Sequence, residues 1–205
     1  MSAARPARLI LAALACVALG GCISLFPKSK PAQLYRFDGE PLQASTALPP
    51  TSARVVARGN MRFETAASAD RILTVTGPDT AYIAGGRWVS PAPVLFEESL
   101  IRAFEAGGGP RLAEGGSTIH ATEVLNLDVQ TFETRYVDGD KAAPQIVVQV
   151  HAQLLRASDR TVIGDQLFTS TQQSGDNRIG PIVQAYDAAV HEVLGKLVSW
   201  TAQQG

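Results

Sequence analysis

The second half of the chain contains three stretches in which apolar and polar side chains alternate, namely residues 119–134, 145–156 and 162–172. A period of two is typical of a β-strand with one buried and one solvated face. Asp138-Gly139 favours a hairpin turn between the first two stretches, and residues 158–161 favour a turn before the third. We therefore expect three antiparallel strands, whose buried face carries Leu125, Leu127, Val129, Ile146, Val148, Val150, Ala152 and Leu154.

Two other stretches repeat apolar residues every three or four positions, which predicts helices with one buried stripe. The first covers residues 91–106, with Ser90 as the expected N-cap, a proline at the first helical position, and glycines from Gly107 onward ending it. The second covers residues 178–202, with Asp176 as a candidate cap. The predicted stripes contain Phe96, Leu100 and Phe104 in the first helix, and Ile179, Ile182, Val183, Tyr186, Val190, Val193, Leu194 and Leu197 in the second.

The first half of the chain adds shorter strand candidates at residues 34–37, 53–58, 71–76 and 81–83. Strands and helices together predict the α/β class. We expect a single two-layer domain over residues 34–205, with a mixed, largely antiparallel sheet packed on two amphipathic helices.

The N-terminus has the pattern of an export signal. Arg5 and Arg8 precede eleven apolar residues, 9–19, which as a helix span only about 16 Å and are too short to cross a bilayer. The following Leu19-Gly20-Gly21-Cys22 resembles the bacterial lipobox. That resemblance implies a signal peptide over residues 1–21, cleavage between Gly21 and Cys22, and a lipid anchor on Cys22. The alternative is an ordinary secretory signal in which the cysteine is incidental.

The expected consequence is attachment to a membrane through acyl chains. Residue 23 is Ile and not Asp, which by resemblance to the known sorting signal favours the outer membrane, with the domain facing the periplasm. Residues 22–33 contain prolines, serines and lysines and read as a short lipidated tether.

The charge balance narrows the possible partners. The chain has 18 Lys+Arg and 19 Asp+Glu, which argues against a nucleic-acid partner. Removal of residues 1–21 takes away two arginines and leaves 16 against 19, a net charge of −3. An acidic body gains nothing from an anionic membrane surface, so the lipid anchor is expected to supply the attachment.

The sequence offers no pattern typical of catalysis. His120, His151 and His191 do not have metal-ligand spacing, and the two cysteines, Cys16 and Cys22, both lie near the N-terminus. No Gly-x-Ser-x-Gly and no Gly-x-x-x-x-Gly-Lys-Ser/Thr motif occurs. We therefore expect a protein that is not an enzyme, with no catalytic residues, no metal and no cofactor.

The order of motifs carries a resemblance to a known family. After the lipobox and a short Tyr-Arg-hydrophobic strand come Tyr82, Arg87-Trp88, Pro91 and Pro93, then an amphipathic helix, three strands and a final helix. This order is similar to that of the ABC-type transport auxiliary lipoproteins, which include the paraquat-inducible protein C-like outer-membrane lipoproteins. The resemblance covers residues 22–202. Family members often carry a further aromatic residue near positions 83 and 84. This chain instead has Ile83-Ala84-Gly85-Gly86, a stretch of mostly small, flexible residues.

The resemblance implies an auxiliary component of a transport system that moves lipids or other hydrophobic molecules across the cell envelope. The implied partners are a mammalian-cell-entry (MCE) domain protein and an ABC permease, and the implied assembly is a homo-oligomeric ring. The alternative is a stand-alone lipoprotein that binds a small hydrophobic ligand or a cell-wall component. Tyr82, Arg87 and Trp88 are candidate partner contacts, since such residues are enriched in binding hot spots, or else they pack over the sheet.

Overall fold

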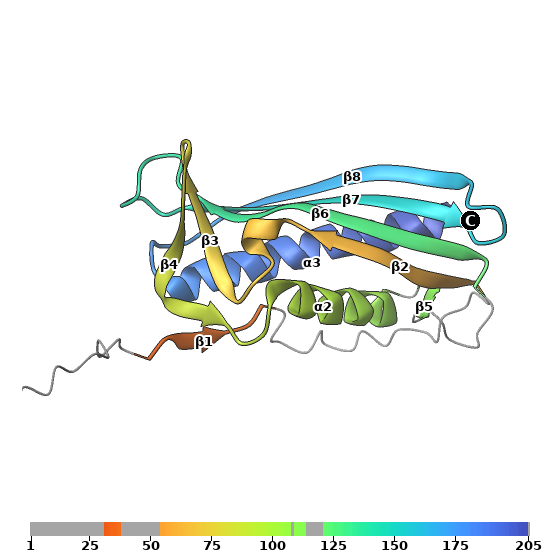
Figure 1. The fold of residues 1–205 in the computed structure, drawn as a ribbon, viewed down its shortest axis with the longest axis horizontal. Helices are drawn as coiled ribbons and strands as arrows, with labels where there is room; N and C mark the ends of the chain where they lie inside the picture. Colours follow the sequence, from red (N-terminus) through yellow and green to blue (C-terminus); the bar gives the residue numbers. More distant parts are fainter. Residues whose placement is uncertain (1–30, 38–53, 108, 114–120, 205) are drawn as a thin grey trace, which may run out of the picture. The chain divides into compact units, whose positions relative to one another are not determined.

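The computed structural model describes residues 31–37, 54–107, 109–113 and 121–204. From Ala32 onward they belong to one compact unit. It contains an open, mixed sheet of eight strands and two α-helices, so the predicted α/β class is confirmed (Figure 1). Within the described part of the chain, neither helix combines the length and the hydrophobicity that a bilayer crossing requires.

The predicted three-strand set is present as β6 (Glu123–Arg135), β7 (Gln145–Arg156) and β8 (Val162–Gln173). β7 pairs antiparallel with both neighbours, and its apolar face is buried as expected. β6 has a register shift between Val129 and Thr131. The buried positions therefore change from odd-numbered residues, such as Leu127 and Val129, to even-numbered ones, Phe132 and Thr134.

The second edge of β6 is shared by two strands that lie end to end. β2 (Val55–Phe63) runs parallel to the first part of β6, and β3 (Arg71–Thr76) runs parallel to its last residues. The 3-10 turn η1 (Thr65–Ala67) links them, and β5 (Arg111–Ala113) extends the sheet beyond β2.

A ten-residue strand, β4 (Asp79–Trp88), forms a hairpin with β3, and β1 (Gln33–Tyr35) pairs parallel with the end of β4. The predicted stretch 81–83 is thus only the middle of a longer strand. Among the described strands, four of the seven pairings are parallel, although the longest ones are antiparallel. Strands that pair in parallel are distant in sequence, so the alternation of apolar and polar residues within one strand does not predict its partner.

The helix α2 (Ala92–Ala106) ends at Gly107 as predicted, but its start differs from the expectation. The N-cap is Pro91, with extended backbone (φ −50°, ψ 139°), and it makes no side-chain cap hydrogen bond. Ser90 therefore lies one residue outside the helix and does not cap it. The buried stripe contains the predicted Phe96, Leu100 and Phe104.

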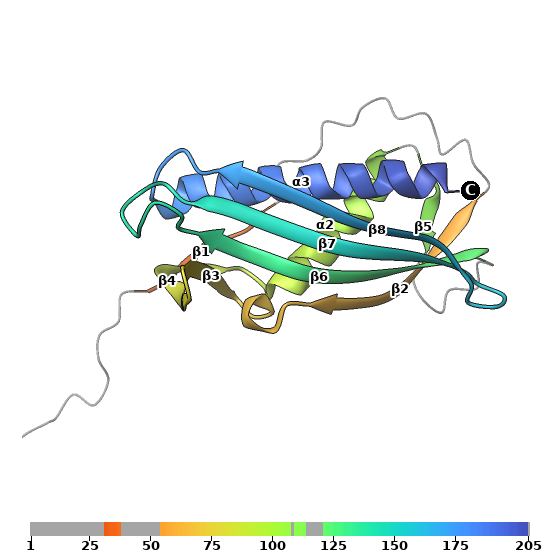
Figure 2. The same cartoon turned by 90° about the horizontal axis from the view of Figure 1, so that it is seen from above.

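The helix α3 (Ile179–Gln203) packs on β7, β8 and α2, and Figure 2 shows it running along the sheet. Its N-cap is Arg178, and Asp176 does not cap it. The Asp176 carboxylate instead accepts a hydrogen bond from Arg178 Nε at 2.6 Å. Pro181 is tolerated in the first turn, where a backbone N–H has no intrahelical partner.

The core is centred on an aromatic cluster. The Trp88 ring meets the rings of Phe37 and Tyr186 edge-on, with centroid distances of 5.1 and 5.2 Å. Phe132 of β6 contacts both Phe37 and Tyr186. Thr134 Oγ1 donates a hydrogen bond to the Tyr186 hydroxyl at 3.2 Å, and burial raises the pKa of this phenol far above its usual value. The cluster joins the segment after β1 with β4, β6 and α3 in one core.

Candidate functional site

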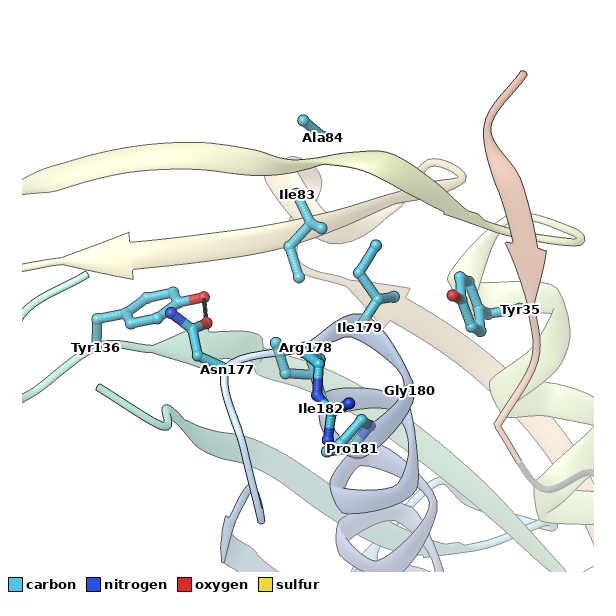
Figure 3. Close-up of a pocket in the computed structure, with 10 residues that line it drawn as sticks. All are labelled: Tyr35, Ile83, Ala84, Tyr136, Asn177, Arg178, Ile179, Gly180, Pro181 and Ile182. Atoms are coloured by element: carbon cyan, nitrogen blue, oxygen red, sulfur yellow. Dashed lines mark hydrogen bonds between the residues drawn. The ribbon is translucent and has the colours of Figure 1, made fainter. Parts of the chain in front are cut away.

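A cavity of about 670 Å³ opens where α3 begins, among the last residue of β1, the middle of β4 and the residue that follows β6 (Figure 3). Its apolar wall is formed by side chains from β1, the middle of β4 and the first turn of α3. The lining residues are Tyr35, Ile83, Ala84, Tyr136, Asn177, Arg178, Ile179, Gly180, Pro181 and Ile182. A concave apolar wall with a few polar groups at its edge is the usual form of a binding site for a small molecule or a side chain.

The β4 residues that line the cavity lie where this strand departs from regular pairing, at Ile83–Gly86. In the β3–β4 ladder, Arg71 pairs with Arg87 but Leu73 pairs with Tyr82, so four residues of β4 bulge out opposite Ile72. Gly85 has φ +79°, a conformation that favours glycine. A Cβ at Gly86 would lie 3.0 Å from Ile179 Cδ1, so a side chain there would push against the start of α3.

The polar edge of the cavity is tied to the turn between β6 and β7. The Tyr136 hydroxyl donates a hydrogen bond to Asn177 Oδ1 at 2.7 Å, and Asn177 Nδ2 donates to the Asp140 carbonyl at 2.8 Å. Burial, with a smaller contribution from the Asp140 charge, raises the pKa of Tyr136. The phenol therefore stays neutral at physiological pH and keeps its proton for Asn177. These hydrogen bonds hold the polar edge of the cavity in place.

The three candidate contacts on β4 do not form one site. Trp88 is buried in the aromatic core, so a partner cannot reach it on the folded domain. Tyr82 is half-buried: its hydroxyl donates to the Ala66 carbonyl at 3.0 Å, and the Arg71 guanidinium stacks 3.8 Å from its ring centroid. Arg87 is half-exposed and pairs with Asp70 at 3.0 Å. Of this set, Arg87 is the side chain most open to solvent.

The residues that line the cavity were missed by sequence reasoning. Tyr35, Ile83, Tyr136 and Ile179 come from four separate segments that meet only through the parallel pairing of β1 with β4 and the packing of α3. The available signal was the Gly85-Gly86 pair, because a double glycine inside a strand indicates a bulge or a close approach.

Cys22 and Gly21 lie outside the described residues, so the anchor and the cleavage position stay predictions. The predicted tether, 22–33, overlaps the domain at its last residue, because Gln33 is the first residue of β1.

Polar side chains cover the solvated face of the sheet. Arg62 donates to Asp128 at 2.7 Å, and His151 Nε2 lies 2.7 Å from an Asp165 oxygen. The hydrogen bond from Arg62 holds the pKa of Asp128 below its usual value, and bonds from Gln153 and then His151 do the same for Asp165. His191 is 3.5 Å from Asp187 on α3, whereas His120 lies outside the described residues. Within the described segments, no three His, Cys, Asp or Glu side chains gather as a metal site.

Comparison with known proteins gives a family match over most of the domain. The sequence profile described as "ABC-type transport auxiliary lipoprotein component" matches residues 35–198. No match is found among curated proteins.

Solved structures show the same fold. The crystal structure of XCC0632 from Xanthomonas campestris, assigned there to the family DUF330, is 26% identical. It covers 85% of this chain and 97% of its own, with a TM-score of 0.72. An uncharacterized protein at 12% identity has a TM-score of 0.61 and covers 85% and 99% of the two chains. The hypothetical protein CT253 of Chlamydia trachomatis, 14% identical, has a TM-score of 0.51 and covers 74% and 99%.

Proposed function

Because the chain belongs to the ABC-type transport auxiliary lipoprotein component family, we propose that it is a non-enzymatic lipoprotein of the outer membrane that assists an MCE/ABC-type system in moving lipids or other hydrophobic molecules. The observation that carries this proposal is the family match, which spans β1 to the last turns of α3. The domain would face the periplasm and bind the transport system, whose MCE-domain protein and ABC permease carry out the movement and the energy coupling.

The lipid anchor is the first part to test. Leu19-Gly20-Gly21-Cys22 supports acylation of Cys22 after cleavage, and two or more acyl chains anchor a protein stably. We expect Cys22→Ser to leave an uncleaved precursor or to release the domain from the envelope, measured by membrane flotation and by mass spectrometry of the N-terminus. Cys16→Ser is the matched control, since residue 16 would be removed with the signal peptide and its replacement should change nothing. Normal anchoring of the Cys22→Ser protein would contradict the proposal.

The partner is tested by affinity capture of the acylated protein from envelope membranes, followed by identification of the captured proteins. The expected result is co-purification of an MCE-domain protein together with ABC permease subunits. The Cys22→Ser protein serves as the control for capture that does not depend on the membrane. Recovery without an MCE protein, under conditions in which other envelope complexes survive, would overturn the transport role.

The proposed ring of identical copies follows from the family resemblance. Native mass spectrometry of the acylated protein in detergent should then show one closed oligomer of fixed size. A monomer that persists across the accessible concentration range would reject the ring while leaving the auxiliary role intact.

The cavity favours a second candidate function, in which the protein binds a small hydrophobic ligand by itself. Its volume of about 670 Å³ and its wall of Tyr35, Ile83 and Ile179 suit an apolar molecule. Ala84→Trp would fill the opening and should abolish binding of a fluorescent apolar probe such as N-phenyl-1-naphthylamine. Ala81→Trp, on the same strand but outside the cavity, is the matched control and should bind normally. Equal binding by both variants, or none by the wild-type protein, would dismiss this candidate.

A further inference from the structure

Exposed apolar side chains gather where the chain enters the domain. Six large apolar side chains are exposed among the described residues, and three of them belong to β1, the residue after β4, and the first turn of α2. These three are Leu34 (59% exposed), Val89 (51%) and Val94 (44%). Figure 1 shows β1, the end of β4 and the start of α2 close together at one end of the domain.

Strand register places Leu34 and Val89 on one surface. Leu34 is the register partner of Arg87, so both side chains lie on the same face of the β1–β4 pair, opposite Trp88. Val89 follows two residues after Arg87, and its backbone N–H donates to the Tyr35 carbonyl at 2.7 Å. The inner face holds Tyr35 and Trp88, which leaves Leu34 and Val89 directed outward.

An ion pair between Arg36 and Glu98 connects α2, which carries Val94, to this surface. Arg36, two residues after Leu34, donates to Glu98 Oε2 at 3.4 Å. Glu98 is four residues after Val94, so the two side chains lie on one face of α2, one turn apart. The "β1 surface" is defined here as Leu34, Arg36, Arg87, Val89 and Val94.

The β1 surface carries two arginines, Arg36 and Arg87, beside its apolar side chains. Each has one carboxylate partner, Glu98 for Arg36 and Asp70 for Arg87. Both ion pairs are solvent-exposed and thus weak, which leaves the guanidinium groups available to other anions.

The β1 surface also lies beside the point of attachment. Ten residues lie between Cys22 and Gln33, and a fully extended chain over these eleven steps reaches at most about 40 Å. A short link to the bilayer gives the surface next to β1 a high effective concentration at the lipid, so that a weak contact becomes occupied.

We propose that the β1 surface rests on the lipid bilayer, with Leu34, Val89 and Val94 at the boundary between headgroups and acyl chains and the arginines at the lipid phosphates. Arginine side chains suit this position because their stems lie along apolar surface while their charged ends reach phosphate. The inference rests on the proposed lipid anchor and adds an orientation to it.

The test uses the full, acylated protein with a single added cysteine at position 34, 89 or 94. Once residues 1–21 are removed and the Cys22 sulfur is acylated, the added thiol is the one that reacts. An environment-sensitive fluorophore is attached, and the protein is reconstituted in phosphatidylethanolamine–phosphatidylglycerol vesicles with or without nitroxide-bearing lipid. Val162→Cys and Leu167→Cys on β8 are the matched controls, because these positions are similarly exposed (50% and 46%).

We expect a blue-shifted emission and severalfold stronger quenching by nitroxide lipid at positions 34, 89 and 94 than at 162 and 167. The double substitution Arg36→Glu, Arg87→Glu should reduce the quenching at position 89. If the labelled protein floats with the vesicles but the fluorophores at all five positions emit as in water, the proposed bilayer contact is wrong, while the lipid anchor is supported. If the labels become shielded only after an envelope protein is added, the surface binds a protein and the proposal is overturned. If the protein does not float, the anchor itself fails.

Discussion

The β6–β7–β8 meander and the β1–β4–β3 end of the sheet are built by different means. In the meander each strand pairs with its neighbour in the chain over almost its full length, and the apolar face of β7, the central strand, is buried. At the β1–β4–β3 end, β1 contributes three residues paired parallel to a distant strand, and β4 contains a four-residue bulge. The regular part holds the largest share of backbone pairing, whereas the irregular part contains both the cavity and the β1 surface. Irregular strands next to a rigid scaffold are where binding sites commonly occur.

Replacing each tryptophan with alanine compares how much one large side chain stabilises each region. Trp88 lies at the β1–β4–β3 end, and Trp200 of α3 packs on the meander. Trp88→Ala removes the centre of the aromatic cluster, and we expect a loss of about 3–5 kcal/mol in the free energy of unfolding. Trp200→Ala, on the half-exposed contact with Phe168, should cost about 1–2 kcal/mol. Urea denaturation followed by circular dichroism measures both. Equal losses would mean that the β1–β4–β3 end does not depend on its aromatic centre.

An ion pair at the start of the meander is expected to have the next largest effect. Arg54 donates two hydrogen bonds to Glu123 Oε2, at 2.9 and 2.6 Å, and both side chains are largely buried. Glu123→Ala leaves the guanidinium without its partner and should cost about 2–4 kcal/mol.

Asp70→Ala breaks the exposed pair with Arg87 and should cost less than about 1 kcal/mol, measured in the same denaturation experiment. If Asp70→Ala lowered the free energy of unfolding more than Glu123→Ala, the buried Arg54–Glu123 pair would not be the more stabilising of the two ion pairs.

Two glycines should respond to alanine with opposite signs. Gly85 has φ +79°, and alanine there should destabilise the domain by about 1–2 kcal/mol. Gly195 lies inside α3 with no atom near the position that a Cβ would take, and alanine there should stabilise by about 0.5–1 kcal/mol. Thermal unfolding midpoints should therefore move in opposite directions, and a rise for Gly85→Ala would show that the bulge does not need the left-handed conformation.

The smallest expected effect is the response of the polar sheet face to acid. The folded-state pKa values of Asp128 and Asp165 lie below their usual range, so the unfolded chain takes up protons first as the pH falls. Their contribution to stability is present above about pH 4, near the unfolded-state pKa, and is lost as the pH drops through the folded-state values.

Urea midpoints between pH 3 and pH 7 should therefore decline less steeply at the acidic end for Asp165→Asn than for the wild-type protein. Gln153→Ala keeps the carboxylate but removes its main hydrogen bond, and should flatten the profile in the same direction. An unchanged profile in both variants would leave no role for this face in acid stability.

The parts of the fold that the sequence predicted are those governed by local patterns. β7 was predicted with its observed bounds, and most of the predicted stripe residues of both helices are buried, because one face of each element carries a periodic signal. Ile179 is the exception, since it is only partly buried and lines the cavity. The caps at Ser90 and Asp176 were wrong, since neighbouring residues, Pro91 and Arg178, begin the helices. The parallel pairing of β2 and β3 with β6 was not predicted, because it joins segments that are distant in the chain.

The candidate site was not predicted from the sequence. Tyr82, Arg87 and Trp88 were proposed as partner contacts, but Trp88 lies in the core, Tyr82 is half-buried and only Arg87 is at the surface. The cavity depends on Ile179 and Tyr136, which reach it from other elements. No periodicity connects such residues, and only the folded arrangement brings them together.

The position of Phe37 has a mechanical consequence. This buried side chain lies two residues after the end of β1 and packs edge-on against Trp88. Any pull on the proposed lipid anchor travels along the tether and β1 and reaches the domain at this aromatic contact, after only three residues of strand pairing. Trp88 and Phe132 both contact Phe37 and Tyr186, so a force applied at the anchor would pass through this cluster to α3.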